Sequence, residues 1–184
     1  MNIRICGTGS ALPERKISND DLSQIMDTSD EWISSRTGIK TRHLATEETT
    51  TSLATEAAKK ALADADMKPE EVELIIAATV TPDHLVPTLS CEVQREIGAV
   101  NAVAFDLGAA CSGFLFALST AQAYIASGRF KNALLIGAEV LSKIMDWNDR
   151  STCVLFGDGA GAIVLSKEEM EKEKVAVFHC FSSL

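Results

Sequence analysis

The most informative stretch of the chain is Ala104-Phe-Asp-Leu-Gly-Ala-Ala-Cys-Ser-Gly-Phe114, which joins two different hydrophobic patterns. Residues Ala102–Asp106 form a short apolar run that is typical of a buried strand, and a helical pattern runs from Ala110 to Ser127. The small residues between the two patterns predict a tight turn from strand to helix, with Cys111 where the helix opens. Such a junction indicates an α/β protein.

The alternation of strand and helix continues on both sides of this junction. Strand patterns occur at Glu73–Thr79 and Ala133–Ala138, and a helical pattern at Thr88–Ile97 lies between the first two strands. The order β-α-β-α-β predicts parallel pairing with right-handed crossovers. The other predicted elements are one helix and three strands, namely Thr50–Asp64, Ile3–Cys6, Ala160–Leu165 and Val175–Phe181. No crossover helix separates the last two strands, so we expect a mixed, mostly parallel sheet.

The composition is that of one soluble globular domain. Of the 184 residues, 46% are hydrophobic and 23% are charged, and no repeat or Pro/Gly-rich linker divides the chain. The formal net charge of −9 argues against a general nucleic-acid or anionic-membrane binder. The uncharged segment Leu107–Ser127 is long enough to cross a bilayer, but it contains Ser, Thr and Gln and follows a strand directly. We therefore expect it to form a buried central helix.

The cysteines and the N-terminus point to the cytoplasm. The five cysteines are widely separated and include no C-x-x-C pair, which argues against a disulfide framework and a zinc site. The first residues lack a basic region followed by a long apolar run, so they do not resemble a secretory signal. The histidines (His43, His84 and His179) show no metal-ligand spacing, and no metal is expected.

Cys111 is the strongest candidate for covalent chemistry. Free amides and the dipole at a helix N-terminus stabilise a thiolate, which is the nucleophilic form of cysteine. Small neighbours from Gly108 to Gly113 would let a substrate carbonyl approach the backbone closely. The alternative is an inert buried thiol, because free cysteine is among the most buried residue types.

A second candidate site combines an aromatic ring with basic residues. The sequence Thr28-Ser-Asp-Glu31 matches a capping box that opens a short helix ending near Gly38 and places Trp32 one turn before Arg36. Lys40 and Arg42 follow, and Arg150 comes after a second tryptophan. An aromatic ring and arginines can bind a nucleotide by stacking and phosphate pairing, although such a group is also common on a solvated surface.

These residues together resemble the N-terminal half of a β-ketoacyl-acyl-carrier-protein synthase III, a condensing enzyme with the thiolase fold. The resemblance extends over almost the whole chain, residues 1–184 being read as one thiolase-like half. The matching motifs are Gly7-Thr-Gly-Ser10, Asp27-Thr-Ser-Asp-Glu-Trp-Ile33, Arg36-Thr-Gly-Ile39, the stretch Ala104–Phe114 and Phe156-Gly-Asp-Gly-Ala-Gly-Ala162.

The resemblance implies that Cys111 takes an acyl group from acyl-CoA and passes it to malonyl-acyl-carrier protein with loss of carbon dioxide. It also implies that Trp32 and Arg150 flank the adenine of CoA, with Thr28 and Arg36 near the nucleotide. Coenzyme A is then a substrate carrier, and no cofactor is expected. The family loop that matches His84-Leu-Val-Pro87 approaches the acyl pocket of a partner subunit, which implies a homodimer. Val86, where some members carry phenylalanine, suggests a primer longer or more branched than acetyl.

One departure from the family is large. The histidine and asparagine that assist decarboxylation lie in the second half of family members, so a C-terminal half in the same or another polypeptide is expected to supply them. The chain by itself is therefore expected to be incomplete in condensation. Two alternatives stay open: another thiolase-fold acyltransferase with a different second substrate, and an acyl-CoA-binding or assembly module that catalyses nothing.

Overall fold

A computed structural model describes residues 2–168, so the strand predicted at Val175–Phe181 lies outside the described residues. A mixed sheet of five strands forms its centre, in the order β1-β7-β6-β4-β5. Strands β4, β5 and β6 are parallel, whereas β7 pairs antiparallel with both β6 and β1. The five strands are β1 (Asn2–Ala11), β4 (Leu74–Ala78), β5 (Val103–Leu107), β6 (Asn132–Val140) and β7 (Asp158–Glu168). The predicted mixed sheet and its parallel β-α-β-α-β unit are confirmed.

The predicted helices are present, together with several short elements that the sequence patterns did not indicate. Between residues 2 and 168 there are six α-helices: α1 (Asn19–Ser23), α2 (Asp30–Thr37), α3 (Thr50–Asp64), α4 (Leu89–Ile97), α5 (Gly113–Ala126) and α6 (Arg150–Cys153). Three single-turn 3-10 helices and a small hairpin complete the fold, namely η1 (Pro69–Glu71), η2 (Ala110–Ser112), η3 (Leu141–Lys143), β2 (Lys16–Ser18) and β3 (Thr41–His43).

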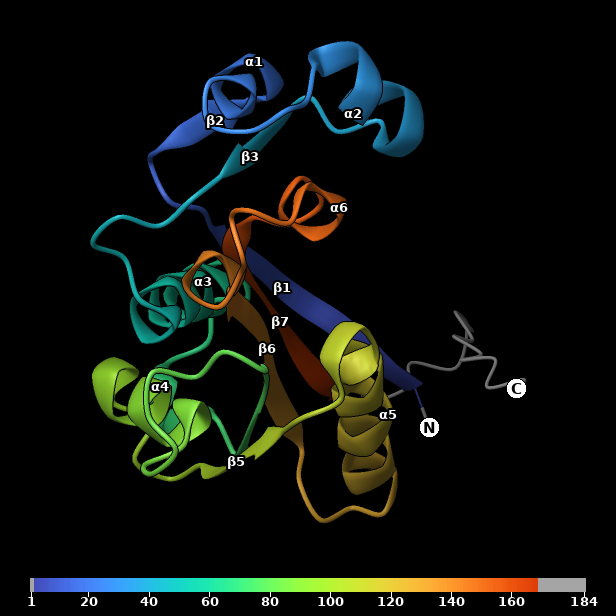
Figure 1. Ribbon diagram of the computed structural model, residues 1–184. Helices are drawn as coiled ribbons and strands as arrows, with labels where there is room; N and C mark the ends of the chain where they lie inside the picture. Colours follow the sequence, from blue (N-terminus) through green and yellow to red (C-terminus); the bar gives the residue numbers. More distant parts are fainter. Residues whose placement is uncertain (1, 169–184) are drawn as a thin grey trace.

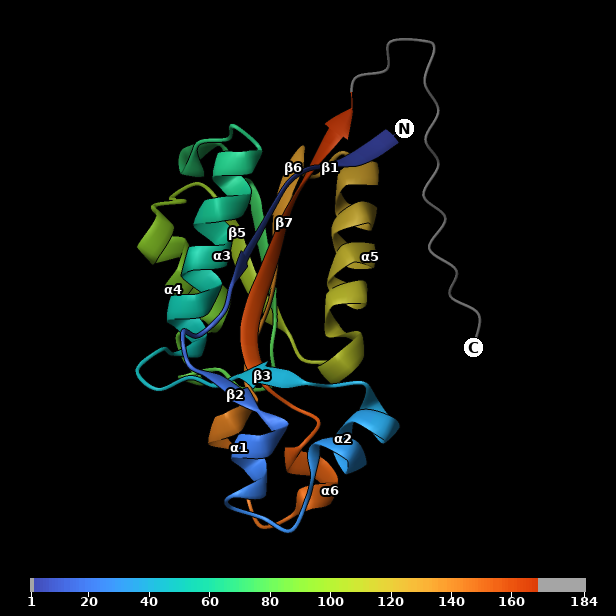
Figure 2. The same cartoon turned by 90° about the horizontal axis from the view of Figure 1, so that it is seen from above.

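Helices cover both faces of the sheet. Figure 2 shows α3 and α4 on one face and α5 on the other. Two apolar clusters reflect this division, because alternate side chains of one strand belong to different clusters: Ile75 packs with α3 and α4, whereas Ile76 packs with α5. The elements α1, α2, α6, β2 and β3 form a cap at one end of the sheet, around Leu22 and Ile33 (Figures 1 and 2).

Helix α5 packs against the sheet with one side, and its other side is exposed within the described chain. Ala117, Ala121 and Ile125 are buried against the sheet, but Leu115 and Phe116 are more than half exposed on the outer side. The reason is that no other element of the described chain packs on that outer side. No helix within residues 2–168 combines the length and the apolarity that crossing a membrane requires.

Candidate active site

Cys111 lies in η2, between the end of β5 and the start of α5, and its side chain is exposed. After β4 the chain continues to α4 on one face of the sheet, whereas after the neighbouring β5 it continues to α5 on the other face. In open α/β sheets, ligands bind at such a switch point, beyond the carboxyl ends of the strands. Within the described chain, the Cys111 thiol is thus not buried.

Two neighbouring features shape the turn that carries Cys111. Ala110 adopts a left-handed conformation with φ of 46°, which costs about 1–3 kcal/mol for a residue with a side chain. The Asp106 carboxylate accepts hydrogen bonds from the amides of Leu89 and Ser90, at 2.9 and 2.8 Å, and so ties the end of β5 to the start of α4. The strained backbone at Ala110 therefore follows a strand end that is anchored to α4.

Gly113 lets α5 begin close to β4. A Cβ atom at this position would lie 3.1 Å from the Cβ of Ala78, the last residue of β4. Helix α5 also begins at the end of the sheet that carries the cap (Figure 2). Cys111 thus lies at the same end of the molecule as the aromatic and basic residues of the cap.

Trp32, Arg36 and Arg150 come together as the sequence predicted. The guanidinium carbon of Arg36 lies 4.5 Å from the centroid of the Trp32 ring, and that of Arg150 lies 5.0 Å from it. Arg150 also donates a hydrogen bond to the Asp27 carbonyl, and its distance to the Asp27 carboxylate is 3.4 Å. Two cations on one indole form a site suited to a flat ring and an anion.

Helix α2, which carries Trp32 and Arg36, is held by a polar network at its first turn. The Asp30 carboxylate accepts hydrogen bonds from Asn19, Ser34 and Lys40, at 2.8, 2.8 and 3.0 Å. These three donors, Asn19 first, lower the pKa of Asp30 to about 2. The carboxylate therefore stays charged at neutral pH, and its hydrogen bonds hold the first turn of α2, which carries Trp32.

The predicted helix start needs a correction of one residue. Ser29, not Thr28, is the N-cap of α2, because its hydroxyl accepts the hydrogen bond from the Trp32 amide at 3.1 Å. The helix ends at Gly38 as predicted, with φ of 73°. The Thr28 hydroxyl is buried and has no hydrogen-bond partner among the described residues. Thr28 follows Asp27, the contact of Arg150, so it belongs to the same corner of the cap.

Two of the basic residues that the sequence grouped with Trp32 are structural. Arg42 is only 5% exposed and donates hydrogen bonds to Asn19 at 2.8 Å and to the Val154 carbonyl at 3.2 Å. Lys40 is paired with Asp30 at 3.0 Å. Arg36 and Arg150 are therefore the cations that remain available to a ligand at Trp32.

Sequence reasoning missed the carboxylate of Glu139, which organises the segment after β4. Glu139 accepts hydrogen bonds from the Val80 amide at 2.8 Å, from Thr79 at 3.3 Å and from the Thr81 hydroxyl. The only sequence signal is an acidic residue inside an otherwise apolar strand, β6. Val86 lies further along this segment and is 85% exposed.

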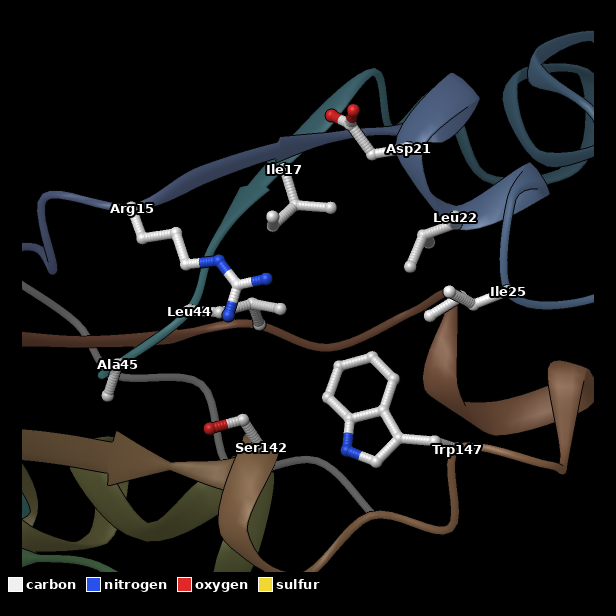
Figure 3. A pocket seen from close by; sticks show the side chains of 9 residues that line it. All are labelled: Arg15, Ile17, Asp21, Leu22, Ile25, Leu44, Ala45, Ser142 and Trp147. Carbon is white, nitrogen blue, oxygen red and sulfur yellow. The ribbon is translucent and has the colours of Figure 1, made fainter.

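A separate cavity of about 340 Å³ opens between the cap and η3. Figure 3 shows Arg15 on one side of this cavity and the Trp147 indole opposite. Its lining residues are Arg15, Ile17, Asp21, Leu22, Ile25, Leu44, Ala45, Ser142 and Trp147. None of the predicted site residues lines it. Across residues 2–168, no group of three or more His, Cys, Asp and Glu side chains could hold a metal ion.

Comparison with known proteins gives one consistent family. A family model described as 3-oxoacyl-[acyl-carrier-protein (ACP)] synthase III matches residues 105–183. The β-ketoacyl-[acyl-carrier-protein] synthase III of Clostridium acetobutylicum is 57% identical over 164 residues, covering 89% of this chain and 50% of that protein. The Aquifex aeolicus protein of the same name is 54% identical over 176 residues, covering 96% of this chain and 57% of that protein. The chain spans about half the length of these curated relatives.

Solved structures agree with the sequence comparison. The crystal structure of 3-oxoacyl-[acyl-carrier-protein] synthase III from Aquifex aeolicus superposes with a TM-score of 0.91 at 55% identity, covering 92% of this chain and 55% of that chain. The priming β-ketosynthase of the R1128 polyketide pathway superposes with a TM-score of 0.88 at 39% identity, covering 91% of this chain and 51% of that chain. These superpositions confirm the fold that the resemblance predicts.

Proposed function

This chain belongs to the 3-oxoacyl-[acyl-carrier-protein] synthase III family and spans about half the length of its curated members. We therefore propose that it carries the nucleophile of the enzyme that starts fatty-acid synthesis. The proposed nucleophile is Cys111. The observation that carries the proposal is the exposed thiol of Cys111, which lies beyond the carboxyl end of β5 on a strained turn directly before the N-terminus of α5.

In the first half-reaction, the Cys111 thiolate attacks the thioester carbonyl of an acyl-CoA. A bond forms between Sγ and the carbonyl carbon, and the bond to the CoA sulfur breaks, so CoA leaves as its thiol. Backbone N–H groups near the start of α5 are suited to stabilise the oxyanion that develops on the carbonyl oxygen. Gly108 leaves open space beside this backbone, since a Cβ there would meet nothing within 4 Å.

In the second half-reaction, malonyl-acyl-carrier protein loses carbon dioxide, and its α-carbon attacks the acyl group on Cys111. As the new carbon–carbon bond forms, the bond between Sγ and the acyl carbon breaks, which releases the Cys111 thiolate and gives a 3-oxoacyl-carrier protein. We propose that the histidine and asparagine that assist this step come from a second half of the enzyme. The exposed outer side of α5, with Leu115 and Phe116, is the apolar surface that such a half would cover.

The cap is the proposed CoA site. Trp32 and Arg150 would flank the adenine ring, and Arg36 with Thr28 would lie near the rest of the nucleotide. The support is the pair of guanidinium groups within 5.0 Å of the Trp32 ring and the partnerless buried hydroxyl of Thr28. The Arg150 guanidinium now stacks directly on Trp32, so an adenine ring between them must displace it.

The proposal includes a homodimer in the cytoplasm that needs no cofactor, with CoA and the carrier protein as carriers of the substrates. Val86 would reach the acyl pocket of the partner copy, and its small side chain would leave room for a primer longer or more branched than acetyl. The five cysteines without a C-x-x-C pair support a reducing compartment.

A condensation assay tests this function. The enzyme that contains this chain is incubated with acetyl-CoA and malonyl-acyl-carrier protein, and the 3-oxoacyl-carrier protein is measured by mass. We expect product from the wild type, at least about a thousandfold less from Cys111→Ala, and unchanged product from Cys6→Ala, which removes a different thiol that is half-buried. Equal product from Cys111→Ala and the wild type would contradict the proposal.

The R1128 priming ketosynthase favours a second candidate, a thiolase-fold acyltransferase outside fatty-acid synthesis. The same assay separates the two candidates through the second substrate. Condensation with malonyl-CoA or another acceptor, and none with malonyl-acyl-carrier protein, would favour this second candidate. Binding of acyl-CoA without any covalent step would instead indicate a passive acyl-CoA-binding module.

A further inference from the structure

The loop between β4 and α4, residues 79–88, presents two large aliphatic side chains to solvent. Leu85 is 88% exposed and Val86 is 85% exposed. In contrast, polar contacts of the residues that precede this tip bind the loop to the rest of the protein. The tip therefore sits on an anchored backbone.

The first two anchors hold the loop before the tip. Glu139 binds the segment directly after β4, through Val80 and Thr81. Asp83 accepts a hydrogen bond from the Thr51 amide at the start of α3, at 2.7 Å, and forms an ion pair with Lys143 at 3.0 Å. These contacts join the loop to β6, α3 and η3.

The third anchor is directly beside the tip. The Nδ1 atom of His84 lies 2.7 Å from one carboxylate oxygen of Glu92 in α4, and the Thr51 hydroxyl donates to the other oxygen, also at 2.7 Å. Because a carboxylate only accepts hydrogen bonds, Nδ1 carries the proton in this contact. Hydrogen bonds to a charged acceptor are the strong ones, and a buried carboxylate needs all of its partners.

Glu92 is unusual for its position. Its side chain is only 7% exposed, whereas the side chain of His84 is 64% exposed. A buried carboxylate is unfavourable unless its hydrogen bonds are made, and here one of them holds His84, the residue next to Leu85. Because these contacts already order the loop, the tip loses less conformational entropy when it docks on another surface.

We propose that Glu92, acting through His84, is a positioning residue that fixes the Leu85–Val86 tip, and that the fixed position of this tip sets primer selectivity. This inference rests on the proposed function, in which the tip lies at the acyl pocket of a second copy of the chain. Glu92 and His84 touch no reacting atom in this account.

Glu92→Gln tests the proposal, with Glu96→Gln as the matched control. Glu96 lies one turn further along α4, is exposed and pairs only with its neighbour Arg95 among the described residues. Two quantities are compared in the enzyme that contains this chain: the ratio of kcat/KM for isobutyryl-CoA to that for acetyl-CoA, and amide hydrogen exchange of residues 84–88.

We expect Glu92→Gln to change the selectivity ratio by at least about threefold and to speed exchange of residues 84–88 by about tenfold or more. Glu96→Gln is expected to change neither quantity. A selectivity ratio in Glu92→Gln equal to that of the wild type overturns the role in selectivity. Unchanged exchange overturns the anchor itself.

Two variants at His84 test the same proposal if Glu92→Gln does not fold. His84 is mostly exposed, so its replacement should not unfold the protein. His84→Asn retains a donor close to the position of Nδ1 and is expected to preserve both quantities, whereas His84→Phe removes the donor and is expected to change both. Equal behaviour of the two variants would overturn the proposal. A wild-type enzyme that never acylates Cys111 would overturn the proposed function instead, and the exchange measurement would still decide the anchor.

Discussion

Trp32 illustrates how single residues define the proposed CoA site. Its ring contacts two guanidinium groups, and the carboxylate that pairs with Arg150, that of Asp27 at 3.4 Å, is itself fully exposed. Each exposed cation–π contact contributes only about 0.5–1 kcal/mol. Arg150 can therefore leave the ring at small cost when a flat ligand arrives.

Trp32→Ala is predicted to raise the KM for acetyl-CoA at least about fivefold, because stacking of one base on an aromatic side chain contributes about 1–3 kcal/mol. The kcat should change little, since Trp32 contacts no reacting atom. A thioester without the nucleotide, acetyl-N-acetylcysteamine, should show the same KM with the variant and the wild type. Trp147→Phe, at the chain's other tryptophan, serves as the control. A KM for acetyl-CoA that is equal in Trp32→Ala and the wild type would refute the stacking role.

Asp83 is predicted to stabilise the protein in a defined pH range. Burial alone would raise the pKa of its carboxyl, but the Thr51 amide and the Lys143 ammonium outweigh burial and hold the pKa at about 2. A folded-state pKa below the unfolded value of 3.8 gives a stabilisation that is complete above about pH 4 and is lost as the pH falls towards 2. Urea unfolding of Asp83→Asn should therefore show a deficit of about 1–2 kcal/mol at pH 7 that narrows below pH 3. A deficit that is the same at both pH values would contradict this assignment.

At the scale of elements, the contact between β1 and α3 explains the motif Gly7-Thr-Gly-Ser10. A Cβ at Gly7 would lie 2.3 Å from the Ala61 carbonyl oxygen, and one at Gly9 would lie 2.2 Å from the Ala57 carbonyl oxygen. These distances are too short for any side chain, and the obstructing atoms belong to backbone. The two glycines thus allow a strand and a helix to touch directly.

Gly9→Ala is predicted to lower the free energy of unfolding by about 3 kcal/mol or more, because the helix backbone must move away from β1. Gly161→Ala, on the neighbouring strand β7, is the matched control, since a Cβ there meets nothing within 4 Å. Its effect should stay within about 0.5 kcal/mol. Urea denaturation midpoints measure both changes, and similar midpoints for the two variants would exclude the close contact.

The long elements follow from their hydrophobic patterns, but the short ones do not. Helix α3 spans Thr50–Asp64 as predicted, because its buried residues recur at helical spacing. The hairpin of β2 and β3 has three residues per strand, too few for a pattern, and α6 has only four. These cap elements are held by tertiary contacts such as those of Arg42, which bonds to Asn19 and Val154 from distant parts of the chain.

The residues of the candidate site could be predicted from the sequence, but most of the contacts that hold them in place could not. Trp32 and Arg36 are one helical turn apart, so the sequence could place them together, and the resemblance added Arg150. The hydrogen bonds that Glu139 and Glu92 accept join segments that are 8 to 60 residues apart in sequence, and no local spacing signals them. The left-handed conformation of Ala110 is likewise set by the elements on either side of it.

At the scale of the whole molecule, the described chain has one covered face and one partly covered face. Helices α3 and α4 pack on one side of the sheet, whereas α5 stands alone on the other with an apolar outer surface (Figure 2). The curated relatives are about twice as long as this chain. In the proposed enzyme, a second half covers α5 and supplies the groups for decarboxylation, while this chain supplies the thiol and the CoA site.

The central claim is that Cys111 carries the acyl group, and peptide mass spectrometry after incubation with acetyl-CoA and an acid quench tests it most directly. The account predicts one acetyl group on the peptide that contains Cys111, none on the peptides that contain Cys6 or Cys91, and none at all in Cys111→Ala. An unmodified Cys111, or equal acetylation of another cysteine, would contradict the account.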